Sequence, residues 1–80
     1  MYYVYLLRSI QSPDQIYFGC TQDVKERLAE HNSGKSTFTS RYKPWEIITS
    51  IEFKNKDSAF AFEKYLKSSA GRAFASKHFW

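Results

Sequence analysis

Residues 2–21, YYVYLLRSIQSPDQIYFGCT, decide the fold because they contain two short apolar segments joined by a polar stretch. Tyr2–Arg8 is rich in Tyr, Val and Leu, a composition typical of a β-strand. Ser9–Gln15 contains Ser, Pro and Asp, which favour a turn. Ile16–Thr21 has the composition of a second short strand. The stretch therefore predicts a β-hairpin with a long loop.

One face of this hairpin is expected to carry tyrosines and a glycine that could form part of a functional site. Side chains alternate across a strand, so Tyr3, Tyr5 and Leu7 are expected to share one face. Tyr17 and Gly19 share a face of the second strand. A glycine inside a strand often marks close approach by another backbone or a ligand. The alternative is that Tyr5 and Tyr17 are half-buried core aromatics, which strands favour.

A helix is expected to begin at Asp23, because Glu26 three residues later completes a possible capping box. Its apolar residues recur at helical spacing in a stripe that ends at His31. Asn32 and Gly34 supply the end of the helix, with Gly34 as the C-terminal cap.

The next part of the chain predicts a polar loop and a third strand. Residues 35–44 are polar, with three Ser or Thr between residues 36 and 39. Trp45–Phe53 is the third strand, and its Ile47, Thr49 and Ile51 are expected to share one face.

The C-terminal part predicts one longer helix and one short one. Asp57 or Ser58 can cap a helix that runs to about Ser68. Ala70-Gly71 is expected to break it, and Arg72–Phe79 to add a last helical turn or two. Residues 1–80 are thus predicted to form one α+β domain, with a three-stranded antiparallel sheet flanked by helices.

The composition excludes several classes of protein. The single cysteine, Cys20, rules out an internal disulfide and a zinc site built from cysteines, and it fits a reducing cytoplasm. The N-terminus lacks the pattern of a signal peptide, and no apolar stretch approaches the roughly 20 residues that cross a bilayer. A cytoplasmic protein without a membrane partner is expected.

The charge points weakly to a polyanion. The net charge is +4, and residues 64–77 contain four cations and no acid: Lys64, Lys67, Arg72 and Lys77. The phosphate backbone of a nucleic acid is a natural partner for such a segment. A solvated helical face explains the same pattern, and the sequence leaves both open.

Arg27 and His31 stand four residues apart, so they share a face of the first helix. A neutral imidazole beside a fixed cation can accept a proton near pH 7. In the alternative, Arg27 pairs with Asp23 or Glu30 on the surface and His31 merely ends the apolar stripe.

Glu63 is the most informative single residue, because the four residues before it are all apolar. Its carboxylate either pairs with Lys67 at i+4 or points into a site. In the second case it would supply one oxygen ligand to Mg²⁺, which commonly uses one or two carboxylates and completes its shell with waters and phosphate oxygens.

These residues resemble the GIY-YIG nucleases nearly from end to end. Tyr3-Val4-Tyr5 resembles the first motif of that family and Tyr17-Phe18-Gly19 the second. The following Arg27 and His31, and Glu63 in FEKYLKS, match its polar positions in order and spacing. EHNSGK (30–35) and EKYLKSSAGR (63–72) look like the small stand-alone members, which are related to the incision domain of the bacterial excinuclease and to Slx1-type nucleases.

The chain departs from the family pattern at four positions. Tyr3 replaces the first Gly of the motif and Phe18 the central Ile. Cys20 stands where some members have a lysine that assists the site, which argues against the excinuclease-like mechanism. His31 in place of a tyrosine points to the version found in Slx1-like proteins and restriction enzymes.

The resemblance implies a metal-dependent endonuclease that acts on DNA, in repair or recombination. Tyr5 would contact the attacking water, His31 would take its proton, and Arg27 would hold the scissile phosphate. Glu63 would bind Mg²⁺ or Mn²⁺, and Tyr17 would orient the phosphate or a metal-bound water. The products would be a 5′-phosphate and a 3′-hydroxyl.

Nucleic-acid contacts are expected from five cations: Lys35, Arg41, Lys64, Lys67 and Arg72. A protein partner or a homodimer would add specificity, because so small a domain has little surface for reading bases. Three other functions compete with the nuclease: a nucleic-acid-binding module without catalysis, a cysteine enzyme using Cys20 and His31, and a peptide-binding domain with exposed aromatics.

Overall fold

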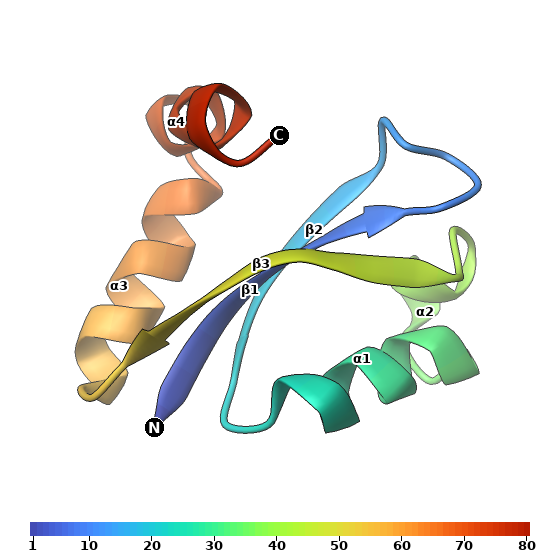
Figure 1. Cartoon of the computed structure of the whole chain (residues 1–80), viewed down its shortest axis with the longest axis horizontal. Helices are drawn as coiled ribbons and strands as arrows, with labels where there is room; N and C mark the ends of the chain where they lie inside the picture. Colours follow the sequence, from blue (N-terminus) through green and yellow to red (C-terminus); the bar gives the residue numbers. More distant parts are fainter.

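The middle strand of the sheet is the first strand of the chain. The computed structural model describes all 80 residues. Its elements are β1 (Tyr2–Ser9), β2 (Ile16–Thr21), α1 (Val24–Ser33), α2 (Thr37–Ser40), β3 (Trp45–Phe53), α3 (Lys56–Leu66) and α4 (Ser69–His78). The strand order is β2-β1-β3, and both pairings of β1 are antiparallel (Figure 1). The predicted α+β class, hairpin and three-stranded antiparallel sheet are confirmed.

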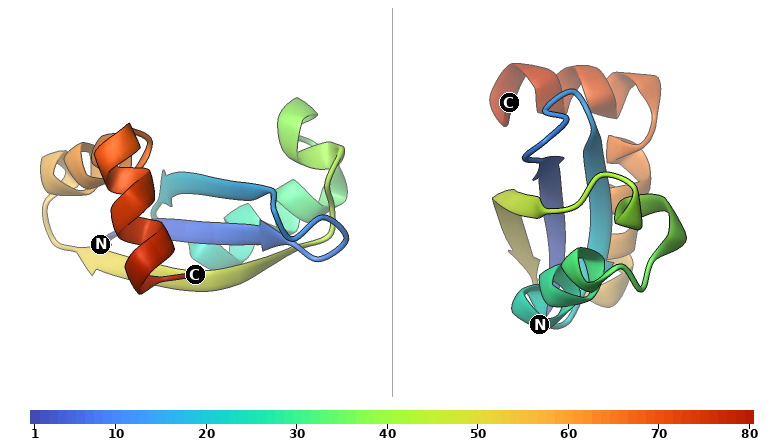
Figure 2. Two further views of the ribbon diagram at one scale, coloured as in Figure 1. Left: turned by 90° about the horizontal axis from the view of Figure 1, so that it is seen from above. Right: turned by 90° about the vertical axis from the view of Figure 1, so that its right-hand side faces the viewer.

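Strand β1 is covered on both of its faces, because helices lie on opposite sides of the sheet (Figure 2). Val4 and Leu6 belong to a cluster with Phe18 and with residues of α3 and α4. Tyr5 and Leu7 belong to a second cluster with Trp45, flanked by residues of α1. The predicted alternation of the two faces is confirmed, and the four consecutive side chains are all buried.

A β-bulge makes one prediction for β3 wrong. Leu6 pairs with Thr49 but Leu7 pairs with Ile47, so the register shifts between them and one residue is extra. Paired residues share a face of the sheet. Thr49 and Ile51 therefore lie on the face of Leu6 and Val4, whereas Ile47 lies on the face of Leu7 and is 37% exposed.

Asp23 and Gly34 cap α1 as predicted, but the capping box is only half formed, because the Asp23 N–H donates to Thr21 Oγ1 and not to Glu26. The Asp23 carboxylate accepts a hydrogen bond from the backbone N–H of Glu26 at 3.0 Å. Gly34 ends the helix with a φ of 87°, in the left-handed region that glycine adopts without strain. The predicted polar loop that follows is wrong in part, because residues 37–40 form the short helix α2 and bury Thr39.

Helix α3 starts differently from the prediction. Asn55, not Asp57 or Ser58, is the N-cap, and its side-chain oxygen accepts hydrogen bonds from the backbone N–H groups of both residues at 2.7 and 3.1 Å. An extended Asn with two free N–H groups ahead of it is a favoured cap.

The break between α3 and α4 lies earlier than predicted. Ser68 caps α4 by accepting from the N–H of Gly71 at 3.1 Å, so Gly71 lies inside the helix. A Cβ at Gly71 would lie 1.8 Å from the carbonyl oxygen of Tyr65. Gly71 therefore lets α4 pack against the end of α3 rather than ending a helix. None of the helices is long and apolar enough to cross a membrane.

Candidate active site

Tyr5 reaches from the middle strand across β2 because Gly19 leaves room for its ring. The two residues are direct partners in the sheet. A Cβ at Gly19 would lie 2.3 Å from both Cζ and Oη of Tyr5, far inside any real contact. The close approach that the glycine predicted is thus made by the ring of Tyr5, which is only 2% exposed.

His31 lies at the centre of a buried hydrogen-bonded chain. Its Nε2 is 3.1 Å from the hydroxyl of Tyr5, and its Nδ1 is 2.8 Å from the hydroxyl of Thr39. The imidazole has no exposed surface. In the tautomer with the proton on Nδ1, His31 donates to Thr39 and accepts from Tyr5, which leaves Nε2 as the basic nitrogen.

Burial sets the protonation states of the two titratable groups in this hydrogen-bonded series, His31 and Tyr5. It lowers the pKa of His31, and the nearby charge of Arg27 lowers it further, so the imidazole is neutral at pH 7. Burial raises the pKa of Tyr5 to about 12; Arg27 offsets the rise in part, while Tyr17 and Glu63 add to it. The neutral Tyr5 hydroxyl is therefore a donor to the neutral imidazole.

Tyr17 packs against the same pair of residues. Its ring lies edge-on to His31 with 4.9 Å between centroids, and 6.3 Å from the ring of Tyr5. The side chain is half-buried on the face that includes Trp45. The structure thus brings the two motif tyrosines and His31 together, as the sequence predicted.

Arg27 lies beside Tyr5 but is engaged by an acid of its own helix. Its Nη1 is 2.7 Å from Glu30 Oε1. The surface pair that the alternative interpretation proposed is therefore present. Hydrogen bonding to Glu30, and then to Tyr5, raises the pKa of Arg27 further, so the guanidinium stays charged.

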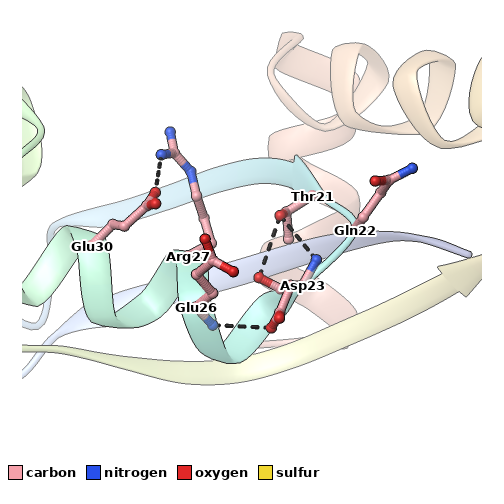
Figure 3. Close-up of a pocket in the computed structure, with 6 residues that line it drawn as sticks. All are labelled: Thr21, Gln22, Asp23, Glu26, Arg27 and Glu30. Carbon is pink, nitrogen blue, oxygen red and sulfur yellow. Dashed lines mark hydrogen bonds and ion pairs between the residues drawn. The ribbon is translucent and has the colours of Figure 1, made fainter.

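A polar hollow of about 270 Å³ opens at this end of β2 (Figure 3). Arg27 and Glu30 lie on one side of it, and no apolar side chain lines it. The other lining residues come from the end of β2, the turn after it and the start of α1: Thr21, Gln22, Asp23 and Glu26.

Glu63 approaches from α3, on the other side of β2. Its charge adds to the raised pKa values of Tyr5 and Cys20. Burial is the main cause of the rise at both residues. Glu63 Oε2 is 3.3 Å from Lys67 Nζ, and its side chain is 21% exposed. The Glu63–Lys67 pair of the alternative interpretation is therefore present as well.

The donor set fits one class of metal. No group of three or more His, Cys, Asp or Glu gathers anywhere in the chain, which argues against a zinc-type site. A single carboxylate with an open side is compatible with Mg²⁺ or Mn²⁺, whose remaining ligands are waters and phosphate oxygens. Glu63 is the residue that would hold such an ion.

The predicted nucleic-acid contacts form two exposed groups. Lys35 and Arg41 flank α2, whereas Lys64, Lys67 and Arg72 lie at the end of α3 and the start of α4. Helix α2 and the junction of α3 and α4, which carry these residues, both lie near β2, one of the two edge strands (Figure 2).

Thr39 is the functional candidate that sequence reasoning missed. It lies in α2, whose position is fixed because the Trp45 Nε1–H donates to the Thr39 carbonyl at 2.8 Å. Its hydroxyl is the second partner of His31. Only the run of Ser and Thr in residues 36–40 hinted that a hydroxyl would turn inward.

Cys20 is not part of this arrangement. His31 bonds to Tyr5 and Thr39, while Cys20 packs against the other cluster of the core. Burial raises the pKa of the Cys20 thiol, which disfavours the reactive thiolate. The geometry gives the cysteine-enzyme interpretation no support.

The family follows from comparison with known proteins. The model of the GIY-YIG catalytic domain matches residues 1–76. The chain belongs to the GIY-YIG family. Its expected membership, inferred above from the two motifs and three later polar positions, is confirmed.

Relatives of two kinds share this GIY-YIG domain. The chain is 39% identical over 80 residues to a UPF0213 protein of Cupriavidus necator, with 95% of this chain and 85% of that protein covered. It is 41% identical over 68 residues to a structure-specific endonuclease subunit slx1 of Talaromyces marneffei, with 78% of this chain covered. The chain spans only 18% of that nuclease subunit and 62% of a UPF0213 protein, YsiG, of Lactococcus lactis.

A solved GIY-YIG relative has the same fold. The solution NMR structure of a UPF0213 protein of Bacillus halodurans superposes with a TM-score of 0.57 at 28% identity. The match covers 99% of this chain and 87% of that one. The helices and the three-stranded sheet described above are therefore those of the family.

Proposed function

We propose that this chain is a divalent-metal-dependent endonuclease that hydrolyses phosphodiester bonds in DNA. The observation that carries the proposal is the buried chain from Tyr5 through His31 to Thr39, set beside the charged groups of Arg27 and Glu63. Hydrolysis of a phosphodiester needs a base for the attacking water, a cation on the phosphate and help for the leaving oxygen. These residues supply one group for each requirement.

His31 is the base in this proposal, and Tyr5 passes the proton to it. Burial raises the pKa of Tyr5 to about 12 and lowers that of His31, so complete proton transfer from Tyr5 to His31 before attack is strongly unfavourable. A free tyrosinate is therefore too costly as an intermediate. Tyr5 instead accepts the proton of the water while it releases its own to His31, so that it stays neutral throughout.

Thr39 positions the imidazole. By accepting from Nδ1–H at 2.8 Å it holds the tautomer in which Nε2 faces Tyr5. It does not touch the substrate. Thr39 is the group that orients the base His31, and it does so with a neutral hydroxyl rather than with a carboxylate.

Arg27 binds the scissile phosphate by offering two parallel N–H donors. Only Nη1 is bonded to Glu30, so the rest of the guanidinium can turn toward an anion. Glu63 holds Mg²⁺ or Mn²⁺, which supplies charge stabilisation to the leaving oxygen when bound. Tyr17, against His31, orients the phosphate, and the products are a 5′-phosphate and a 3′-hydroxyl.

The names of some relatives support endonuclease activity, while a DNA substrate and a role in repair or recombination are part of this proposal. One group is described as structure-specific endonuclease subunits, within which this chain matches a small part. A partner or a second copy of the chain supplies further specificity in this proposal. Cys20 is a free thiol, which suits the reducing cytoplasm.

The test is cleavage of labelled DNA duplexes, flaps and single strands with Mg²⁺, Mn²⁺ or EDTA. We expect nicking that needs the metal and leaves 5′-phosphate ends. Glu63→Gln should abolish cleavage while the melting temperature changes little, because the Glu63–Lys67 pair lies at the surface, with Lys67 exposed and Glu63 partly exposed, and such a pair contributes about 0–1 kcal/mol. Glu46→Gln, an exposed carboxylate on β3, is the matched control. Full activity of Glu63→Gln would exclude the metal role.

A second candidate function is a nucleic-acid-binding module without catalysis. The ion pairs favour it, because Arg27 and Glu63 are both engaged by side chains of their own helices. Binding without cleavage by the intact protein, under every metal tested, would select this alternative over the nuclease.

A further inference from the structure

A second hollow lies at the start of β2, next to the proposed site. Its volume is about 280 Å³. Three elements line it: the start of β2, helix α2 and the junction of α3 and α4, which stand on either side of β2 in Figure 2. The lining residues are Ile16, Tyr17, Phe18, Phe38, Lys67 and Arg72.

Phe38 gives this hollow a flat apolar wall. It is 50% exposed, although its ring packs against Tyr17 and Tyr42, with 6.2 Å and 5.8 Å between ring centroids. These two rings support Phe38 from the protein side and leave much of its surface open. A supported, exposed aromatic ring is the platform on which unpaired bases stack.

The opposite wall carries positive charge. Arg72 donates from Nε to the carbonyl of Lys67 at 3.4 Å, which leaves its terminal nitrogens for another acceptor. Lys67 is 49% exposed, with Glu63 as its single ion-pair partner. No acid lines this hollow, whereas three carboxylates line the one at Arg27. An anion is therefore bound more favourably in this hollow than in the hollow at Arg27.

Tyr17 joins the hollow to the proposed chemistry, because it lines the hollow and also packs 4.9 Å from His31. We propose that the hollow holds an unpaired nucleotide of the DNA strand next to the bond that is cut. Its base stacks on Phe38 and its phosphate meets Arg72 and Lys67. This inference rests on the proposed nuclease function and names its substrate class: DNA that is unpaired beside the cleavage position.

A fully paired duplex cannot use this hollow. Its bases are stacked on one another inside the helix, so that their flat faces are not available to Phe38. A flap, a gap or a single strand presents such a face without the cost of unpairing. The hollow therefore discriminates by structure and not by sequence.

The experiment measures binding in EDTA, where no cleavage occurs. Two labelled probes are compared, a paired duplex and the same duplex with unpaired extensions at its 5′ or 3′ ends. Phe38→Leu keeps an apolar side chain but removes the ring, and Phe38→Trp keeps a ring. Phe60→Leu on α3 is the control, because Phe60 is 44% exposed and does not line the hollow.

Phe38→Leu should weaken binding of the extended probe by about 5- to 150-fold, the range for loss of one stacked base, and leave the paired duplex unchanged. Phe38→Trp and Phe60→Leu should bind both probes like the parent. Arg72→Gln should lower the slope of log K against log salt by about 0.7 on the extended probe. Equal losses of Phe38→Leu on both probes, or none, would overturn the proposal.

Cleavage of the same probes with Mg²⁺ separates this inference from the nuclease function. Equal cleavage of both probes by the parent and by Phe38→Leu would overturn the nucleotide site and leave the nuclease in place. Selective binding of the extended probe through Phe38, with no cleavage under any metal, would keep the site and overturn the nuclease.

Discussion

Replacing Gly19 with alanine should disable the site through Tyr5 alone. The added Cβ would lie 2.3 Å from Tyr5 Cζ and Oη, and ordinary contact begins at 3.4 Å, so the ring must move by more than 1 Å. The ring is buried and cannot swing into solvent. A shift of this size stretches the 3.1 Å bond to His31 beyond hydrogen-bond length.

The expected loss in cleavage rate is about 100-fold, the typical cost of misplacing a reacting group by 1 Å. Stability should fall as well. Overpacking costs about 1–3 kcal/mol, while alanine in a strand recovers roughly 0.5–1 kcal/mol of backbone entropy relative to glycine. The net destabilisation is therefore about 0–2.5 kcal/mol, and its middle value shifts the melting temperature by several degrees in a chain of this length.

The assay is single-turnover cleavage of labelled DNA with Mg²⁺, together with thermal unfolding by circular dichroism. Cys20→Ala is the matched control, since it changes the next residue of β2 on the opposite face. A parental rate for Gly19→Ala would refute the argument. A further 100-fold loss when Gly19→Ala is added to Tyr5→Phe would also refute it, because the glycine would then act by another route.

Three further predictions concern the buried chain and the helix junction. Tyr5→Phe and His31→Ala should not add in cleavage rate, because either breaks the relay; multiplicative losses would mean independent roles. Burial lowers the pKa of His31 in the folded protein. The free energy of unfolding should therefore be highest above the ordinary pKa of 6.5 and should fall as the pH drops below it. Chemical denaturation between pH 5 and 8 should show that His31→Gln lacks this dependence. Gly71→Ala should lower the melting temperature, because the overlap with the Tyr65 carbonyl outweighs the roughly 1 kcal/mol gained in helix propensity; a raised melting temperature would contradict the packing role.

The sequence was sufficient for the three strands and for helix α1, but it missed the short helix α2 and its Thr39. The continuous run of Tyr, Val and Leu predicted β1, and the alternation of side chains along any strand predicted its two faces. The spacing of Arg27 and His31 predicted a shared helix face. The glycine at position 19 predicted a close approach, although only the structure identified Tyr5 as the group that uses it.

The errors have a common physical cause, which is that packing between distant segments overrode local signals. The bulge opposite Leu6 and Leu7 depends on pairing between β1 and β3 and leaves no mark in either strand alone. Gly71 resembled a helix end because glycine is a poor helix former, yet it is required by the approach of α4 to Tyr65. Thr39 became a partner of His31 only because Trp45 holds α2 in place.

The division of the core by β1 has a consequence for how the protein loses activity on heating. Tyr5 and His31 depend on the cluster beneath α1, while Glu63 depends on the cluster beneath α3 and α4. Segments of a protein can open separately, with free energies below that of global unfolding. Partial opening of α3 and α4 would take Glu63 away from Tyr5 while the sheet stays intact. On heating, cleavage activity should therefore be lost at a lower temperature than the one at which the sheet melts. The amides of β1 should be the last to exchange with deuterium.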